Sequence, residues 1–152
     1  MIITNDEEGM REALNEARKA FNLGEIPIGA IICDDKGKII ARAHNLRETT
    51  HDATAHAEVL AIRQACQIIK NWRLSDLTLY VTLEPCPMCA GALFMSRIKR
   101  VVYGKTDFRA GACESVFNIV NNPYLNHQIE IRAGVKEDEC IALLQQFFKQ
   151  QR

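Results

Sequence analysis

Residues 77–93 read LTLYVTLEPCPMCAGAL and contain, in order, the pattern of a strand, a short connection and the start of a helix. The β-branched and aromatic residues within 77–82 are typical of a buried strand. Cys86 follows as the expected N-cap of the helix, and Pro87 takes the first helical position, where its missing N–H removes no hydrogen bond. The stretch therefore predicts a strand that leads directly into a helix whose start carries two cysteines.

Helical and strand patterns alternate on both sides of this unit. Apolar residues at helical spacing predict one helix from Asn5 to a C-cap at Gly24, and another from Ala55 to Ile69 with Thr54 as N-cap. Further helices are predicted at 115–120 and 137–148, and strands at 26–33, 38–43, 77–82, 100–103 and 129–132. A short Asp/Gly loop makes the first two strands antiparallel neighbours. The alternation predicts an α/β fold in which helices cover both faces of a central sheet.

Composition excludes several classes of protein. Of 152 residues, 47% are hydrophobic and 25% are charged, as in folded proteins and unlike disordered ones. The apolar runs are too short to cross a bilayer. The chain starts without a basic and then apolar leader, so a reducing cytoplasm suits its six cysteines better than a disulfide framework. We expect one cytoplasmic domain over residues 1–152, without a membrane anchor.

Charge limits how the protein could contact nucleic acid. The 19 basic and 19 acidic side chains cancel, so no global positive field is present and contact would need a local patch. Basic residues gather around the fourth strand and at the end of the chain: Arg97, Lys99, Arg100, Lys105, Arg109, Lys149 and Arg152. They form either such a patch or ordinary solvated faces.

Cys86 and Cys89 form a Cys-x-x-Cys motif at the predicted helix start. Residues three apart are neighbours on a helix, and the N-terminal dipole of the helix lowers the pKa of thiols there. The pair suits a metal ion, and it equally suits a thioredoxin-like redox centre. The motif alone does not decide between them.

His56-Ala57-Glu58 lies at another predicted helix start, thirty residues before Cys86. Two helix starts that follow strands can face one another at one sheet edge, and they would supply one imidazole and two thiolates to a zinc ion. Three protein ligands leave a fourth position for a water molecule, and Glu58 would move its proton as general acid and base. His-x-Glu followed by Pro-Cys-x-x-Cys is the signature of zinc-dependent nucleobase deaminases, in which hydroxide attacks C6 of adenine or C4 of cytosine.

The chain also resembles the bacterial tRNA-specific adenosine deaminases over nearly its whole length. The resemblance runs through GEIPIGAIIC, ARAHNLRET, TAHAEVLAIRQA, WRLSDLTLYVTLEPCPMCAGAL and SRIKRVVYG. It implies a three-layer α/β/α fold of the cytidine-deaminase type with a mixed five-stranded sheet, one zinc ion per subunit, and a homodimer. It also implies a tRNA anticodon stem-loop as partner, with the wobble adenosine converted to inosine.

Site residues follow from this resemblance position by position. It makes His56, Cys86 and Cys89 the zinc ligands and Glu58 the proton carrier. It makes Asn45, Asp107, Arg109 and Phe148 substrate-binding residues, with Asp107 near the ribose of the flipped nucleotide. Glu84 matches the family pattern without a role that the sequence assigns. Glu114 departs from the pattern, because it places an anion where the family commonly has glycine.

Three rival functions stay open at this point. A deaminase of a free base, guanine or cytosine, shares the His-Ala-Glu and Pro-Cys-Pro-Met-Cys motifs. A thioredoxin-like oxidoreductase would need neither zinc nor Glu58. A catalytically silent zinc-binding RNA module would keep the ligands but would not need a general base.

Overall fold

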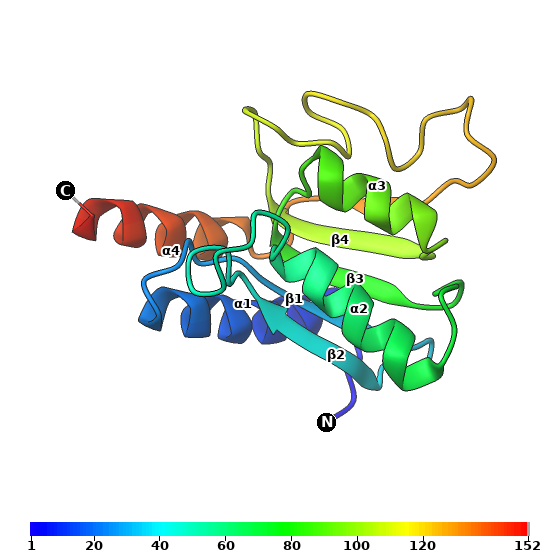
Figure 1. Ribbon diagram of the computed structural model, residues 1–152, viewed down its shortest axis with the longest axis horizontal. Helices are drawn as coiled ribbons and strands as arrows, with labels where there is room; N and C mark the ends of the chain where they lie inside the picture. Colours follow the sequence, from blue (N-terminus) through cyan, green and yellow to red (C-terminus); the bar gives the residue numbers. More distant parts are fainter. Residues whose placement is uncertain (152) are drawn as a thin grey trace.

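The computed structural model describes residues 1–151, so Arg152 of the terminal basic group lies outside the described residues. Its strands are β1 (Gly29–Cys33), β2 (Ile39–His44), β3 (Thr78–Leu83), β4 (Arg100–Lys105) and β5 (Glu130–Arg132). They form one sheet in the order β2-β1-β3-β4-β5 (Figure 1). β1 pairs antiparallel with both β2 and β3, whereas β3, β4 and β5 pair in parallel. The predicted mixed five-stranded sheet is confirmed.

Two layers of helices enclose the sheet. α1 (Asp6–Asn22) and α4 (Glu137–Gln150) lie on one face, and α2 (Ala57–Ile69) and α3 (Pro87–Met95) lie on the other (Figure 1). Each face has its own apolar core, one built around the alanines of α2 and one around Met10, Ala13 and Leu14 of α1. This is the predicted α/β/α arrangement. No helix within residues 1–151 is long and apolar enough to span a membrane.

Local contacts correct the start of the second helix. Thr54 was the predicted N-cap, but its backbone N–H and its hydroxyl donate to Asp52 at 2.8 Å and 2.7 Å. The helix therefore begins later, at Ala57, with His56 as its N-cap. This shift brings the imidazole out of the first turn and to the very end of the helix.

The predicted helix at 115–120 is wrong. The segment forms turns, in which the N–H groups of Val116 and Phe117 both donate to the carbonyl of Gly111. The N–H of Ile119 donates to the carbonyl of Ala112 and not to that of Ser115, so the hydrogen bond expected within such a helix does not form. The other differences are of a few residues at element ends, and the largest is a first strand that begins at Gly29 instead of Ile26.

A network of hydrogen bonds around Asp6 joins the start of α1 to strands β3, β4 and β5. Arg100 donates to both carboxylate oxygens of Asp6 at 2.7 Å, Arg132 donates at 2.6 Å, and the Tyr80 hydroxyl donates at 2.9 Å. These donors, Arg100 foremost, lower the pKa of the buried Asp6 carboxyl to about 2. Arg100 is therefore bound within the protein and is not free to bind RNA. It no longer counts among the basic residues of the predicted patch.

Candidate metal and catalytic site

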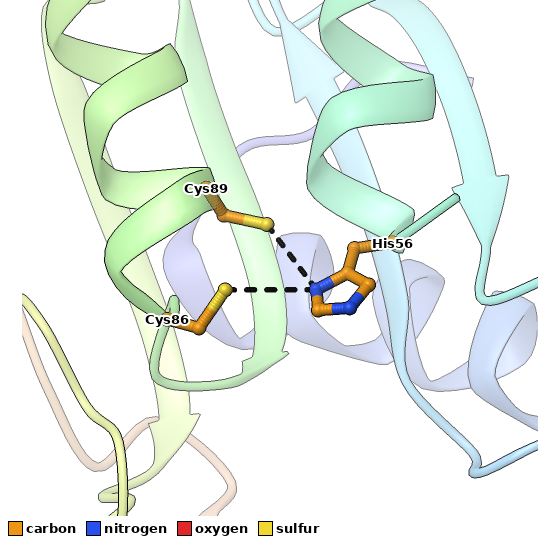
Figure 2. A group of neighbouring side chains, drawn as sticks. All are labelled: His56, Cys86 and Cys89. Carbon is orange, nitrogen blue, oxygen red and sulfur yellow. Dashed lines mark hydrogen bonds between the residues drawn. The ribbon is translucent and has the colours of Figure 1, made fainter. Parts of the chain in front are cut away.

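Three ligand atoms converge at the edge of the sheet where β3 ends. Nδ1 of His56 lies 3.6 Å from Sγ of Cys86 and 3.5 Å from Sγ of Cys89 (Figure 2). One ligand atom from each residue lies within 4.8 Å of the other two. The structure thus brings together the three residues that the sequence predicted as a ligand set.

The start of each helix positions its ligand. His56 is the N-cap of α2 and Cys86 is the N-cap of α3, and both have extended backbone torsions. Neither side chain hydrogen-bonds to its own helix. Both side chains point instead into the space between the two helix ends, and Cys89 joins them from the first turn of α3 (Figure 2).

The spacing of these atoms fits a zinc ion. Zinc binds sulfur at about 2.3 Å and imidazole nitrogen at about 2.0–2.1 Å in tetrahedral geometry, which places such ligand atoms about 3.5 Å apart. The measured nitrogen–sulfur separations are 3.5 Å and 3.6 Å. An imidazole beside both sulfurs favours a metal site over a redox pair, since a redox pair needs no third ligand. All six cysteines are free thiols.

The three side chains also shift one another's pKa values. A hydrogen bond from Cys89 and a further one with His56 lower the pKa of Cys86 to about 4. The pKa of Cys89 is raised because this thiol donates to Cys86 and is buried. Contact with Cys86 raises the pKa of His56. The lowered pKa of Cys86 favours its thiolate, the form that binds metal, and a bound cation would favour loss of the Cys89 proton as well.

Glu58 lies beside this cluster in the first turn of α2 and is 4% exposed. Burial raises the pKa of its carboxyl to about 7, and the negative charge of Cys86 adds to the effect. A carboxyl group with a pKa near neutrality can both accept and donate a proton. Its role as proton carrier stays a prediction.

Glu84 is a buried residue of the site to which sequence reasoning gave no role. It lies two residues before Cys86, is 2% exposed, and accepts hydrogen bonds from the backbone of the loop that follows β4. Its pKa is lowered, because these bonds outweigh the effect of burial. The sequence motif TLEPC marks Glu84 as part of the expected pattern. The motif does not show that the Glu84 side chain binds the loop after β4.

The predicted substrate residues lie in different parts of the molecule. Asn45 is buried, with its amide nitrogen donating to the carbonyl of Ile26 at 3.2 Å and its amide oxygen accepting from the N–H of Arg47 at 3.1 Å. Phe148 is 48% exposed on α4 and packs against Phe147, in the helical layer opposite α2 and α3.

Asp107 and Arg109 follow β4. The carboxylate of Asp107 accepts from the N–H of Arg109 at 3.0 Å and so shapes a turn, while the Arg109 side chain is exposed. Glu114, the residue that departs from the expected pattern, accepts from the Tyr103 hydroxyl at 3.0 Å. Its charge is thereby directed toward β4, and its backbone keeps the bond to Glu84.

The known proteins that this chain is similar to are deaminases by three separate comparisons. The model of the MafB19-like deaminase family matches residues 4–152. A tRNA-specific adenosine deaminase of Bacillus subtilis (strain 168) is 50% identical over 150 residues, which cover 99% of this chain and 92% of that protein. A solved structure from work on A-to-I editing by tRNA:A34 deaminases at the wobble position has 42% identity and a TM-score of 0.84, and the match covers 89% of this chain and 97% of the other.

A second solved structure is relevant to the free-base alternative. Guanine deaminase from Bacillus subtilis is 38% identical with a TM-score of 0.65, over 84% of this chain and 83% of the other. Its likeness to this chain is lower in both measures than that of the wobble-editing structure.

The fold and the cluster of His56, Cys86, Cys89 and Glu58 define a deaminase with a candidate metal centre. The long match at 50% identity narrows the class further. The chain belongs to the family of tRNA-specific adenosine deaminases.

Proposed function

We propose that this protein deaminates adenosine to inosine at the wobble position of tRNA anticodon loops, as a zinc-dependent hydrolase acting on a cyclic amidine. The observation that carries the proposal is the joint presence of a His/Cys/Cys cluster with zinc spacing and a buried glutamate beside it. The substrate rests on relatives named as tRNA-specific adenosine deaminases.

The reaction replaces the C6 amino group of adenine with oxygen from water and releases ammonia. His56, Cys86 and Cys89 would hold one zinc ion per subunit, and that ion supplies an acidified water molecule as nucleophile. Glu58 takes one proton from the attacking water and delivers it to the ring nitrogen of the base. It then takes the remaining proton from the new C6 hydroxyl and delivers it to the amino group, which leaves as ammonia. Burial of Glu58 keeps these protons from bulk solvent.

The remaining roles are proposed from the family resemblance. Asn45 contacts the flipped base, Asp107 and Arg109 hold its ribose and backbone, and Phe148 lies beside the RNA. The turn formed by Asp107 uses one carboxylate oxygen, so its other oxygen is available to a ribose hydroxyl. A homodimer of single-domain subunits in the cytoplasm, where tRNA is modified, completes the proposal.

An inosine assay tests this function. The zinc-loaded protein is incubated with anticodon-loop RNA hairpins, matched DNA hairpins, and free guanine, adenine and cytosine. Inosine in the RNA hairpins alone supports the proposal. Turnover of guanine without turnover of any hairpin would instead assign the protein to the free-base deaminases.

Metal dependence is measured on the same protein. Removal of zinc by a chelator should abolish inosine formation, and added zinc should restore it, because the acidified water depends on the ion. Full activity after complete zinc removal would contradict a catalytic metal.

A further inference from the structure

We propose that Glu84 is a positioning residue that holds the loop 107–115 in the shape that receives RNA. The inference rests on the proposed function, because it assigns substrate binding to that loop. Its structural basis is a set of contacts around one buried carboxylate.

The carboxylate of Glu84 collects donors from one loop. One oxygen, Oε2, accepts from three consecutive backbone N–H groups, those of Cys113, Glu114 and Ser115, at 3.1, 3.0 and 3.2 Å. The other oxygen, Oε1, accepts from the N–H of Asp107 at 3.0 Å. Consecutive N–H groups that point at one anion form a concave binding site, here filled by the protein's own side chain.

The side chain of Ser115 also contacts Oε1 of Glu84. Its Oγ lies 2.6 Å from Oε1 of Glu84 and 2.8 Å from the carbonyl oxygen of Asp107. A hydroxyl has one proton, and the shorter contact and the negative charge favour donation to Glu84. Both ends of the loop are thus attached to one carboxyl group.

The loop leaves no room for a side chain at Gly111. A Cβ atom there would lie 2.3 Å from Oε1 of Glu84 and 2.3 Å from Oγ of Ser115. The glycine is needed because the loop backbone closes directly over the carboxylate, and not because of a left-handed torsion. Close packing of this kind fixes one conformation of the loop.

The chain also connects the loop to the metal ligands. Glu84 and Cys86 are separated by Pro85 alone, and the carbonyl of Pro85 accepts from the N–H of Ala112 at 2.8 Å. The N–H of Glu84 donates to the carbonyl of Lys105 at 2.9 Å, where β4 ends. Both bonds use backbone atoms only, so they should keep Cys86 in place when the Glu84 side chain is changed.

The contacts distinguish this role from ordinary stabilisation of the core. Within residues 1–151 no lysine or arginine pairs with Glu84, and every donor to its carboxylate comes from the loop 107–115. The same loop presents Phe108 and Arg109 to solvent. The buried charge thus sets the shape of a surface loop whose exposed side chains are free for a ligand.

The test substitutes Glu84→Gln, which keeps the size of the side chain but directs an amide N–H₂ at backbone donors. Because several charge-assisted hydrogen bonds are lost, KM for the RNA hairpin should rise by about tenfold or more. The rate at saturating hairpin should change far less, and the zinc content should stay the same. Gly111→Ala should reproduce this split, and Ser115→Ala should give a weaker form of it.

Asp6→Asn is the matched control, because Asp6 is a second buried carboxylate with several donors, located where β4 begins. It should lower stability without changing KM. Equal KM values for Glu84→Gln and the control would assign Glu84 a merely structural role. Loss of zinc from Glu84→Gln would place its effect on Cys86 instead of the loop, and would also overturn the proposal.

Hydrogen exchange separates this inference from the proposed function. The amides of Cys113, Glu114 and Ser115 should be protected in wild-type protein and should exchange faster in Glu84→Gln, and RNA should not be needed for the difference. If no hairpin is a substrate but the exchange difference is found, the proposed function is wrong, whereas the role of Glu84 in holding the loop is supported. Unchanged exchange in the variant would overturn that role itself.

Discussion

Glu58 and Glu84 are two glutamates buried at the same edge of the sheet, with 4% and 2% of their surface exposed, yet their pKa values move in opposite directions. Burial raises the pKa of both, because a charged carboxylate loses solvation. Glu84 accepts four backbone N–H groups and the contact of a hydroxyl, which more than offset that cost. Glu58 lies beside sulfur ligands that add negative charge.

The difference shows that donors, and not depth, set the charge state of a buried carboxyl group. One glutamate is held as an anion and can only accept hydrogen bonds. Burial and nearby negative charge raise the pKa of the other, which favours its protonated form and suits the proposed role in proton transfer. The same residue type thus binds a loop at one position and, in the proposed mechanism, moves protons at another.

The largest expected effect comes from removing the proton carrier. Glu58→Gln keeps the shape of the side chain but cannot shuttle a proton, so the single-turnover rate should fall by about 10²–10⁴-fold. Zinc content, measured by metal analysis, should remain at the wild-type level, because Glu58 lies outside the ligand set. A near-normal rate in this variant would show that another group moves the protons.

A smaller effect is expected from Asp6, a third buried carboxyl group, whose donors are mainly arginines. Its pKa falls from 3.8 to about 2, so it stabilises the folded state above pH 4 and loses this contribution as pH falls toward 2. Asp6→Asn should lower the free energy of unfolding at pH 7 by about 2 kcal/mol. Urea titrations of both proteins should converge as the pH approaches 2, and a constant difference would contradict the assigned cause.

The smallest effect is expected from the half-buried carboxylate of Asp107, in the loop that Glu84 holds. Asp107→Asn retains an oxygen that can accept from the N–H of Arg109, so the turn should persist. Loss of the charge should lower the preference for RNA over DNA hairpins by about tenfold or less, the value of one charge-assisted hydrogen bond at the surface. The measurement is kcat/KM on matched hairpins. An unchanged ratio would leave Asp107 with its turn alone.

The sequence predicted the sheet and its helical layers because strands and helices here carry strong periodic patterns. It also predicted that His56, Cys86 and Cys89 would meet, since each lies at the start of a helix that follows the sheet, and the structure brings them together. Periodicity and motif spacing are local properties, and they suffice where a chain obeys local preferences.

The sequence failed where a distant group overrides those preferences. Residues 115–120 have a helical pattern, but the Glu84 carboxylate, some thirty positions earlier, holds the preceding loop. The N–H groups of Val116, Phe117 and Ile119 then reach back to Gly111 and Ala112 and form no helical bonds. The direction of the Glu114 side chain depends on Tyr103 of β4. Neither of these contacts is contained in a local pattern. The error at Thr54 has a local cause instead, because Asp52 and Thr54 form a turn that precedes the helix.

Helices α2 and α3 both begin with a residue whose side chain makes no capping hydrogen bond. At an N-cap, Ser, Thr, Asn or Asp would satisfy a free N–H group and add about 1 kcal/mol of stability. His56 and Cys86 make no such capping bond, and their side chains point toward each other instead. In the metal-free protein the first turns of α2 and α3 should therefore fray more readily than the rest of these helices, through local opening that leaves the sheet intact. Bound metal would act as a shared staple for two open helix ends.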